Sequence, residues 1–308
     1  MKRLTAEGSP PSCSGKLSLM MKTILDIVIA GLLMGGIYAL IAVGLGLQYG
    51  VARVLNISHG EFIMLGAFAT WSLYTKLGIS PLLSLAICGP LAFVIGFVLH
   101  RTLFTRLRTS SGSSAAYEGS SMLASFGLLF IIQNLALIAW GADIRAYTYL
   151  AFPVNLGGAV FAANRLAALS FAIVASLGFY LFLSRTRLGK GIRAAAQDPA
   201  TAALMGVNIN RVLALCFGFG ASMAGLAGML ISMCYPFHAT MGLGYTVIAI
   251  IVVVLGGLGS ILGSFIGGFV LGLIGAIVTY VDPGLSLAAY YLIFVLLLLL
   301  KPTGILGK

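Results

Sequence analysis

The sequence contains few charged residues, and most of those it has carry the same sign. Only 8% of its 308 residues are charged, with 18 Lys or Arg against 7 Asp or Glu, whereas a soluble domain has about 25%. The stretch 212–280 lacks Asp, Glu, Lys and Arg altogether and has room for about three membrane-spanning segments of roughly 20 residues. This composition excludes a soluble core and predicts an all-α, polytopic integral membrane protein.

Residue types that carry chemistry are scarce as well. There are 3 His and 4 Cys, without the paired spacing of a disulfide framework or a metal centre. The pairs Gly15-Lys16 and Gly189-Lys190 are not followed by the Ser or Thr that a phosphate-binding loop requires. We therefore expect no catalytic residues, no metal and no cofactor in this chain, which is predicted not to be an enzyme.

Apolar segments separated by short polar stretches predict eight or nine transmembrane helices. The first 20 residues are polar, which predicts a disordered tail before a single membrane domain over 21–308. A Ser/Gly-rich stretch at 110–121 reads as a linker, and the Gly-rich stretch 244–277 as two broken helices. The predicted spans are Thr23–Gln48, Glu61–Leu77, Leu82–Phe104, Ser121–Trp140, Arg165–Ser184, Val212–Cys234, Tyr245–Leu258, Leu262–Tyr280 and Leu285–Leu300.

Positive charge predicts the orientation, because cytoplasmic loops are enriched in Lys and Arg. This rule also explains the net charge of +11 without a nucleic-acid-binding surface. It places the loop 185–211 inside together with the Arg101, Arg106 and Arg108 cluster and the C-terminal Lys301 and Lys308, and it places 141–164 outside as an ordered loop. The same count puts Lys2, Arg3, Lys16 and Lys22 outside. Either the rule fails there, or the segment 51–60 is not a simple loop between spans.

The basic loop 185–211 contains a short helix with its own start and stop signals. Asp198 is a good N-cap, and Pro199 suits the first helical position, where a missing N–H costs nothing. Gly206 suits the left-handed position that follows a helix. A capped helix in a cytoplasmic loop is typical of a surface offered to another protein, which favours a transporter driven by a separate motor.

A second polar stretch, 53–62, gathers Asn56, Ser58, His59 and Glu61 between two apolar spans. Ser58 and Glu61 have the spacing of a capping box that starts the next helix. Alternatively, these side chains line a conduction path, since ionisable groups at membrane depth usually face a cavity. The two interpretations are compatible.

Other polar residues inside apolar spans are weaker candidates for the path. Gln133 and Asn134 lie together within one span, and Tyr38 and Gln48 lie in the first span. Such residues also commonly form hydrogen bonds to a neighbouring helix, and this is the first interpretation for Gln133 and Asn134.

At these residues the chain resembles the permease subunits of branched-chain amino acid ABC importers. The segment Asn56-Ile-Ser-His-Gly-Glu61 is close to the family's Asn-Phe-Ala-His-Gly-Glu. Further matching segments are Gly31–Leu45, Gly127–Asn134, Arg193–Gly206, Val254–Ser260 and Pro302–Gly307.

The resemblance implies a subunit of the bacterial inner membrane that pairs with a second, related permease. It also implies two cytoplasmic ATPase subunits that drive the importer. ATP and Mg would bind to those ATPases, and a periplasmic or lipid-anchored binding protein would deliver the substrate. The role of coupling to the ATPase carries over to Arg193, Asp198, Pro199, Ala203 and Gly206.

The family also includes importers of urea, short amides and aromatic acids, so the substrate stays open between these and branched-chain amino acids. An ATP-independent channel or secondary carrier is a second hypothesis, against which stands the capped basic loop that such a protein does not need. A membrane-embedded enzyme is a third, and it lacks a catalytic set.

Overall fold

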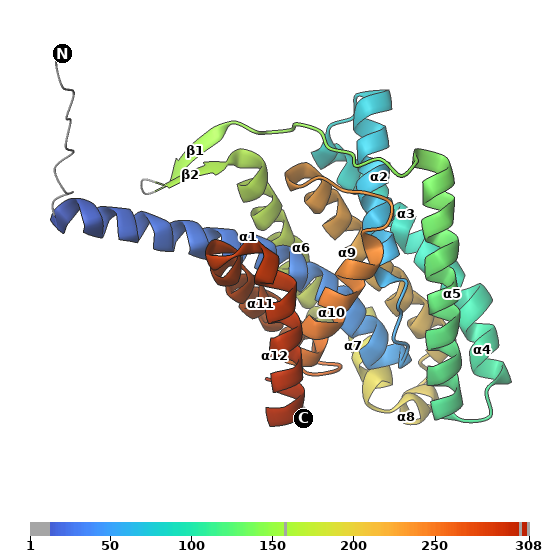
Figure 1. Cartoon of the computed structure of the whole chain (residues 1–308). Helices are drawn as coiled ribbons and strands as arrows, with labels where there is room; N and C mark the ends of the chain where they lie inside the picture. Colours follow the sequence, from blue (N-terminus) through green and yellow to red (C-terminus); the bar gives the residue numbers. More distant parts are fainter. Residues whose placement is uncertain (1–12, 157–158, 302–303, 307–308) are drawn as a thin grey trace, which may run out of the picture.

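The computed structural model describes residues 13–156, 159–301 and 304–306, and this part of the chain is almost entirely helical (Figure 1). A π-helical turn, η1, joins α3 to α4, and a 3-10 turn, η2, precedes α12. The α-helices are α1 (Cys13–Ala52), α2 (His59–Leu77), α3 (Pro81–Leu99), α4 (Thr105–Ser110), α5 (Ser114–Trp140), α6 (Ala163–Arg185), α7 (Arg187–Gln197), α8 (Pro199–Leu204), α9 (Ile209–Cys234), α10 (Gly242–Gly256), α11 (Ile261–Val281) and α12 (Ser286–Leu300).

Seven helical stretches in the described residues are long and apolar enough to cross a membrane. Each of the nine predicted spans corresponds to a helix, which confirms the all-α membrane fold. The two spans outside the seven are α2, whose buried residues include charged and polar ones, and α10, which has only 15 residues. The Gly-rich stretch forms two helices, as expected, and they separate at Gly257 and Gly259, which both have positive φ.

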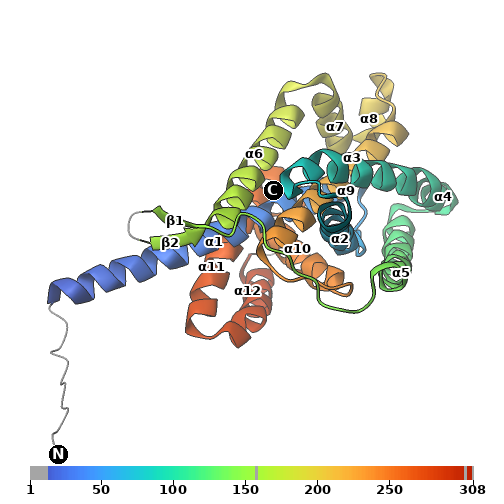
Figure 2. The ribbon, with the colours of Figure 1, turned by 90° about the horizontal axis from the view of Figure 1, so that it is seen from above.

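Helices α1 and α9 form the centre of the molecule. Helix α9 is the most buried of the spanning helices and packs between α2 and α3, while α1 packs along α11 and α9. In Figure 2, α6 and α7 lie on one side of α1, and α11 and α12 lie on the other. Small residues allow this packing: a methyl group at Gly66 of α2 would overlap the carbonyl of Gly225 on α9.

The basic segments lie at one end of the molecule. The α7–α8 loop, the connection between α4 and α5 and the end of α12 are all at the bottom of Figure 1, as the charge pattern predicted. The antiparallel hairpin of β1 (Pro153–Leu156) and β2 (Ala159–Ala162) lies at the opposite end. We call these the basic end and the hairpin end.

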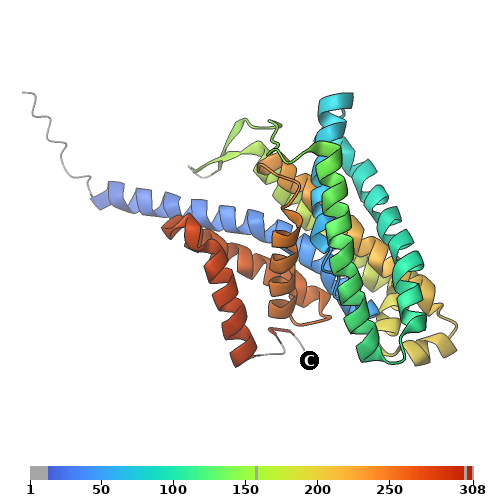
Figure 3. The ribbon, with the colours of Figure 1, turned by 45° about the vertical axis from the view of Figure 1, so that its right-hand side comes forward.

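Helix α1 slopes from the hairpin end towards the basic end (Figure 3). Lys16 and Lys22 in its first turns therefore lie towards the hairpin end, as the count of spans required. The alternative that 51–60 is not a simple loop also holds, because the chain between α1 and α2 turns back into the interior. Lys2 and Arg3 lie outside the described residues.

Two sequence-based boundaries are wrong. Helix α1 begins at Cys13, so 13–20 are helical rather than part of a disordered tail, while 1–12 lie outside the described residues. The stretch 110–121 is mostly helical rather than a linker. Ser113 caps α5 by accepting a 3.2 Å hydrogen bond from the N–H of Ala116, and this cap starts the helix well before the apolar residues on which the prediction relied.

Candidate functional site

The chain between α1 and α2 is held inside the protein by side chains from three other helices. Non-helical backbone at membrane depth requires such partners, because lipid offers none. Ser125 of α5 accepts a 3.1 Å hydrogen bond from the N–H of Ile57. The Asn56 amide donates to Gln48 Oε1 at 3.3 Å, and Gln48 in turn donates to the carbonyl of Phe217 on α9 at 3.1 Å. This segment is thus tied directly to α1 and α5, and through Gln48 to α9.

The predicted capping box at the start of α2 is absent. Ser58 precedes the helix but makes no side-chain cap. Its hydroxyl instead donates to Asn56 Oδ1 at 2.7 Å, and its backbone N–H donates to the same oxygen at 3.2 Å. The spacing of Ser58 and Glu61 is that of a capping box, but the side-chain oxygen of Asn56, two residues before Ser58, accepts hydrogen bonds from both the hydroxyl and the backbone N–H of Ser58.

The first turns of α2 and α10 meet inside the molecule. The N–H of Gly60 donates to Thr246 Oγ1 at 2.8 Å, and the Thr246 hydroxyl lies 2.9 Å from the carbonyl of Ile57. A methyl group at Gly60 would overlap the carbonyl of Gly242, the first residue of α10. Only glycine permits this approach, which brings the N-terminal ends of two helices together.

Glu61 and His59 are buried at this junction. His59 is fully buried, and its Nε2 donates to the carbonyl of Ile41 on α1 at 3.2 Å. Glu61 is 1% exposed, and neither of its carboxyl oxygens has a hydrogen-bond partner among the described residues. Buried polar atoms are almost always hydrogen-bonded, so an exception calls for an explanation. Asn56 and Ser58 form hydrogen bonds with each other, and Asn56 also bonds to Gln48. Glu61 makes no comparable bond that would explain its burial.

Of the other predicted path residues, Gln48 meets this segment through Asn56, whereas Tyr38, Gln133 and Asn134 lie elsewhere. Tyr38 is buried elsewhere, with its hydroxyl 3.5 Å from that of Tyr290 on α12. Asn134 is exposed and donates to the carbonyl of Phe130, four residues earlier in its own helix, so it is not Asn134 that makes the expected bond to a neighbouring helix within the described chain. Gln133 beside it is half-buried.

Sequence reasoning missed two residues that hold the junction together, Ser125 and Thr246. The available signal was weak, since each is a single hydroxyl residue within an apolar helix. Such residues are usually hydrogen-bonded to the backbone of their own helix, and only their position opposite the turn after α1 gives them a second partner.

The predicted N-cap of the loop helix is confirmed. Asp198 Oδ1 accepts hydrogen bonds from the N–H groups of Ala200 and Thr201 at 2.9 and 3.2 Å, and Oδ2 accepts from the Thr201 hydroxyl. These bonds, above all that of the Thr201 hydroxyl, hold the pKa of Asp198 below its usual range. Pro199 is the first residue of α8, as predicted.

The end of the loop helix is confirmed to within one residue. Helix α8 ends at Leu204, and Gly206 has φ of +87°. The N–H of Gly206 donates to the carbonyl of Ala203 at 3.0 Å, and that of Val207 donates to Ala202 at 3.1 Å. These two bonds form a Schellman motif, which needs the left-handed residue.

Helix α8 presents an apolar surface at its C-terminal end. Leu204, the last residue of α8, and Met205 after it are 87% and 82% exposed. Ala203 is exposed too, whereas Ala202 is buried. Large apolar side chains so fully exposed on a polar loop are typical of a contact surface.

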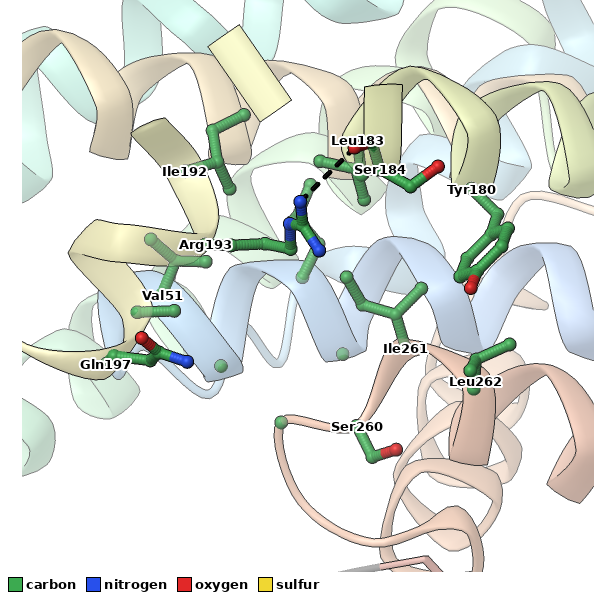
Figure 4. A pocket seen from close by; sticks show the side chains of 15 residues that line it. Val51, Tyr180, Leu183, Ser184, Ile192, Arg193, Gln197, Ser260, Ile261 and Leu262 are labelled. Carbon is green, nitrogen blue, oxygen red and sulfur yellow. Dashed lines mark hydrogen bonds between the residues drawn. The ribbon is translucent and has the colours of Figure 1, made fainter. Parts of the chain in front are cut away.

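Arg193 connects this loop to the membrane helices. Its guanidinium donates to the carbonyl of Ser184 near the end of α6 at 3.2 Å. Figure 4 shows Arg193 pointing into a cavity of about 340 Å³ between α1, α6, α7 and the connection from α10 to α11, with Gln197 and Ser260 on its wall. Arg193 thus ties α7 to the end of α6 beside this cavity.

The described residues between α5 and α6, 141–156 and 159–162, are held by contacts to other elements, as expected of an ordered loop. Asp143 and Arg145 form an ion pair of 3.3 Å, and the Arg145 guanidinium lies 5.2 Å from the ring centre of Trp71. The backbone of Arg145 exchanges two hydrogen bonds with Phe237, which follows α9.

Comparison with known proteins identifies the family. Residues 27–301 match the model of the permease component of branched-chain amino acid transport systems. The chain is 32% identical over 300 residues to the high-affinity branched-chain amino acid transport system permease protein BraD of Pseudomonas aeruginosa, covering 91% of this chain and 95% of that protein. It is 29% identical over 294 residues to the corresponding permease protein LivH of Escherichia coli K12, covering 90% and 94%.

A shorter match joins the chain to a sugar transporter. The ribose import permease protein RbsC of Escherichia coli K12 is 32% identical over 120 residues, which cover 37% of each chain. No solved structure gives a significant match. The chain belongs to the family of permease components of branched-chain amino acid transport systems.

Proposed function

We propose that this chain is one transmembrane subunit of an ATP-driven importer that moves branched-chain amino acids across the bacterial inner membrane. It pairs with a second, related permease subunit. Two cytoplasmic ATPase subunits bind and hydrolyse ATP with Mg, and a binding protein delivers the substrate on the other side. The chain itself carries no catalytic role.

Helix α8 is the observation that carries this proposal. Its two ends are capped by Asp198 and Gly206, so the backbone has a defined length and position. Leu204 and Met205 project from it, and an apolar helix face suits a groove on another protein. Through Arg193, a push on α7 and α8 reaches the end of α6. A channel or carrier without a motor has no use for this arrangement.

The junction of α2 and α10 supports a path for a polar substrate. Two helix N-termini provide positive dipole ends inside the protein, and the Glu61 carboxyl group has no hydrogen-bond partner in the part of the chain that the structure describes. We assign Glu61 to the translocation path, where it becomes accessible when the helices separate. Asn56, Ser58 and His59 hold the broken backbone beside it.

Reconstitution tests the proposal. The chain is co-expressed with its partner subunits, purified, and placed in vesicles with the binding protein. We expect leucine to accumulate only with ATP and only with the ATPase subunits present. Leucine equilibration without ATP would instead indicate a channel or carrier, and uptake of urea, short amides or aromatic acids in place of leucine would transfer the proposal to another substrate of the same family.

A matched pair of variants isolates the contact of α8. Replacing Leu204 and Met205 by Ser should remove the ATPase subunits from the purified complex, whereas Ala200→Ser, on the exposed first turn of the same helix, should not. Unchanged binding of the ATPase in the Leu204, Met205 variant would contradict the proposed contact.

A further inference from the structure

A groove of about 420 Å³ crosses one face of α1 near the hairpin end. This volume is within the range of roughly 300–1,000 Å³ typical of small-molecule sites. The groove is bordered by the start of α6, the residue after α9, the second half of α11 and the first half of α12; Figures 1 and 2 show α11 and α12 beside α1. In the orientation that the charges indicate, it opens outside.

Two opposite charges border this groove without meeting. Asp26 of α1 and Arg165 of α6 both lie on its wall, and neither takes part in an ion pair in the part of the chain that the structure describes. The Arg165 guanidinium lies over the ring of Tyr235, 5.7 Å from its centre. Charged residues within membrane helices are costly and usually mark a ligand pathway, and here two of opposite sign line the same groove.

The rest of the groove is apolar with a few hydroxyl groups. Ile27, Ala30 and Met34 share the face of α1 that carries Asp26, and Ala276 faces them from α11. Tyr290 of α12 is 6% exposed, and its hydroxyl meets that of the buried Tyr38. The predicted path residue Tyr38 thus lies behind this groove rather than at the α2–α10 junction.

We propose that this groove binds a zwitterionic amino acid with an aliphatic side chain. The ammonium group of the ligand pairs with Asp26, its carboxylate pairs with Arg165, and its side chain packs against the apolar face of α1. The proposal rests on the proposed function and adds to it a site on the outer side of the path. A neutral substrate such as urea would have no use for the two separated charges.

Three ligands test the contributions of Asp26 and Arg165 one at a time. Leucine carries both, 4-methylpentanoate lacks the ammonium, and 3-methylbutylamine lacks the carboxylate. Binding to the purified transporter complex, without the binding protein, is followed by saturation-transfer NMR and competition. We expect wild type to bind leucine at least about tenfold more tightly than either analogue, since each analogue loses one charge-assisted contact.

The variants should behave as mirror images. Asp26→Asn should weaken leucine binding about tenfold or more and leave the binding of 4-methylpentanoate unchanged. Arg165→Gln should weaken leucine binding by a similar factor and leave the binding of 3-methylbutylamine unchanged. Glu118→Gln on α5 and Arg106→Gln on α4 are controls at the basic end, away from the groove. Asp26→Glu and Arg165→Lys retain the charges and should retain the preference for leucine.

The two proposals fail in different ways. If wild type shows ATP-driven leucine uptake but binds all three ligands alike, or binds none, or if the variants match their controls, the groove is not the site. If wild type shows no ATP-driven leucine uptake, the proposed function fails, whether or not the groove binds leucine.

Discussion

The carboxyl group of Glu61 on α2 lies directly against Gly242, the first residue of α10, so that a methyl group at Gly242 would overlap it. The contact joins two helices whose N-terminal ends meet inside the protein. Gly60 is pressed against the Gly242 carbonyl on the same side. Gly60 consequently has no room for a side chain, whereas a side chain at Gly242 would require the Glu61 carboxyl group to move.

Gly242→Ala should destabilise the protein by about 1–3 kcal/mol, the usual cost of forcing extra atoms into a packed interior. Gly244→Ala is the matched control, because a methyl group there meets nothing within 4 Å. Thermal unfolding in detergent measures both. Glu61→Ala in the Gly242→Ala background should recover part of the loss, since contacting residues are not additive; strict additivity would contradict the contact.

Glu61→Gln should separate stability from transport. Within the described chain the wild-type carboxyl group has no hydrogen-bond partner. Its neutral isostere should therefore unfold at the same temperature or higher, because a buried charge without a partner is costly. Uptake of leucine in vesicles should nevertheless be lost. Full uptake by Glu61→Gln, with normal assembly, would mean that Glu61 has no charged role in the path.

Gly206→Val should uncouple ATP hydrolysis from uptake or lose the ATPase. Space is available at this position, so the cost comes from the positive φ alone and is about 1–2 kcal/mol, too little to unfold the protein. It is enough to shift the end of α8. Gly206→Asn should be milder, since Asn tolerates this conformation, and Gly191→Ala on α7 serves as the control.

ATPase activity, uptake and subunit stoichiometry are measured together for these variants. Wild-type coupling in Gly206→Val, or in a chain whose Pro199–Leu204 helix is replaced by a Gly/Ser linker, would show that the loop does not transmit force.

Asp198 should act as a capping group at every physiological pH. A depressed pKa in the folded state means that the cap is present above the unfolded pKa of about 3.9 and is lost as the pH falls through the lower, folded value. Coupling should therefore not change with Asp198 protonation between about pH 5 and pH 8. Asp198→Asn should retain coupling, because Asn caps equally well, and Asp198→Ala should lose it. A loss in Asn equal to that in Ala would point to the charge rather than the cap.

Asp143 and Arg145 should differ in their effect on docking of the binding protein. The Asp143 side chain is 80% exposed, so Asp143→Lys should weaken docking at about 0.01 M salt and have little effect at about 1 M, where charges are screened beyond about 3 Å. Arg145 also bonds to the carbonyl of Trp140 and lies over Trp71. Arg145→Glu should thus weaken docking at both salt concentrations. Cysteine labelling of position 143 from the cytoplasmic side would overturn both the docking and the orientation.

Features determined within a few neighbouring residues could be predicted from sequence alone. Composition and apolar length specify the membrane helices, since lipid admits only backbone that bonds within its own helix. The ends of α8 could be predicted because Asp198, Pro199 and Gly206 act on backbone groups within one or two helical turns. The common end of the basic segments followed from counting spans.

Tertiary structure alone decided the environment of Glu61, Tyr38 and Asp26. The spacing of Ser58 and Glu61 fits a capping box, but Asn56 accepts the serine donors, and the segment is fixed by Gln48, Ser125 and Thr246 from three different helices. Likewise, Asp26 and Arg165 share a groove only because α1 packs between α6 and α11. A local pattern reports which hydrogen bonds are available within a turn of helix. Which of them form, and which side chains are buried without a partner, depends on helices that are distant in the sequence and are brought together by packing.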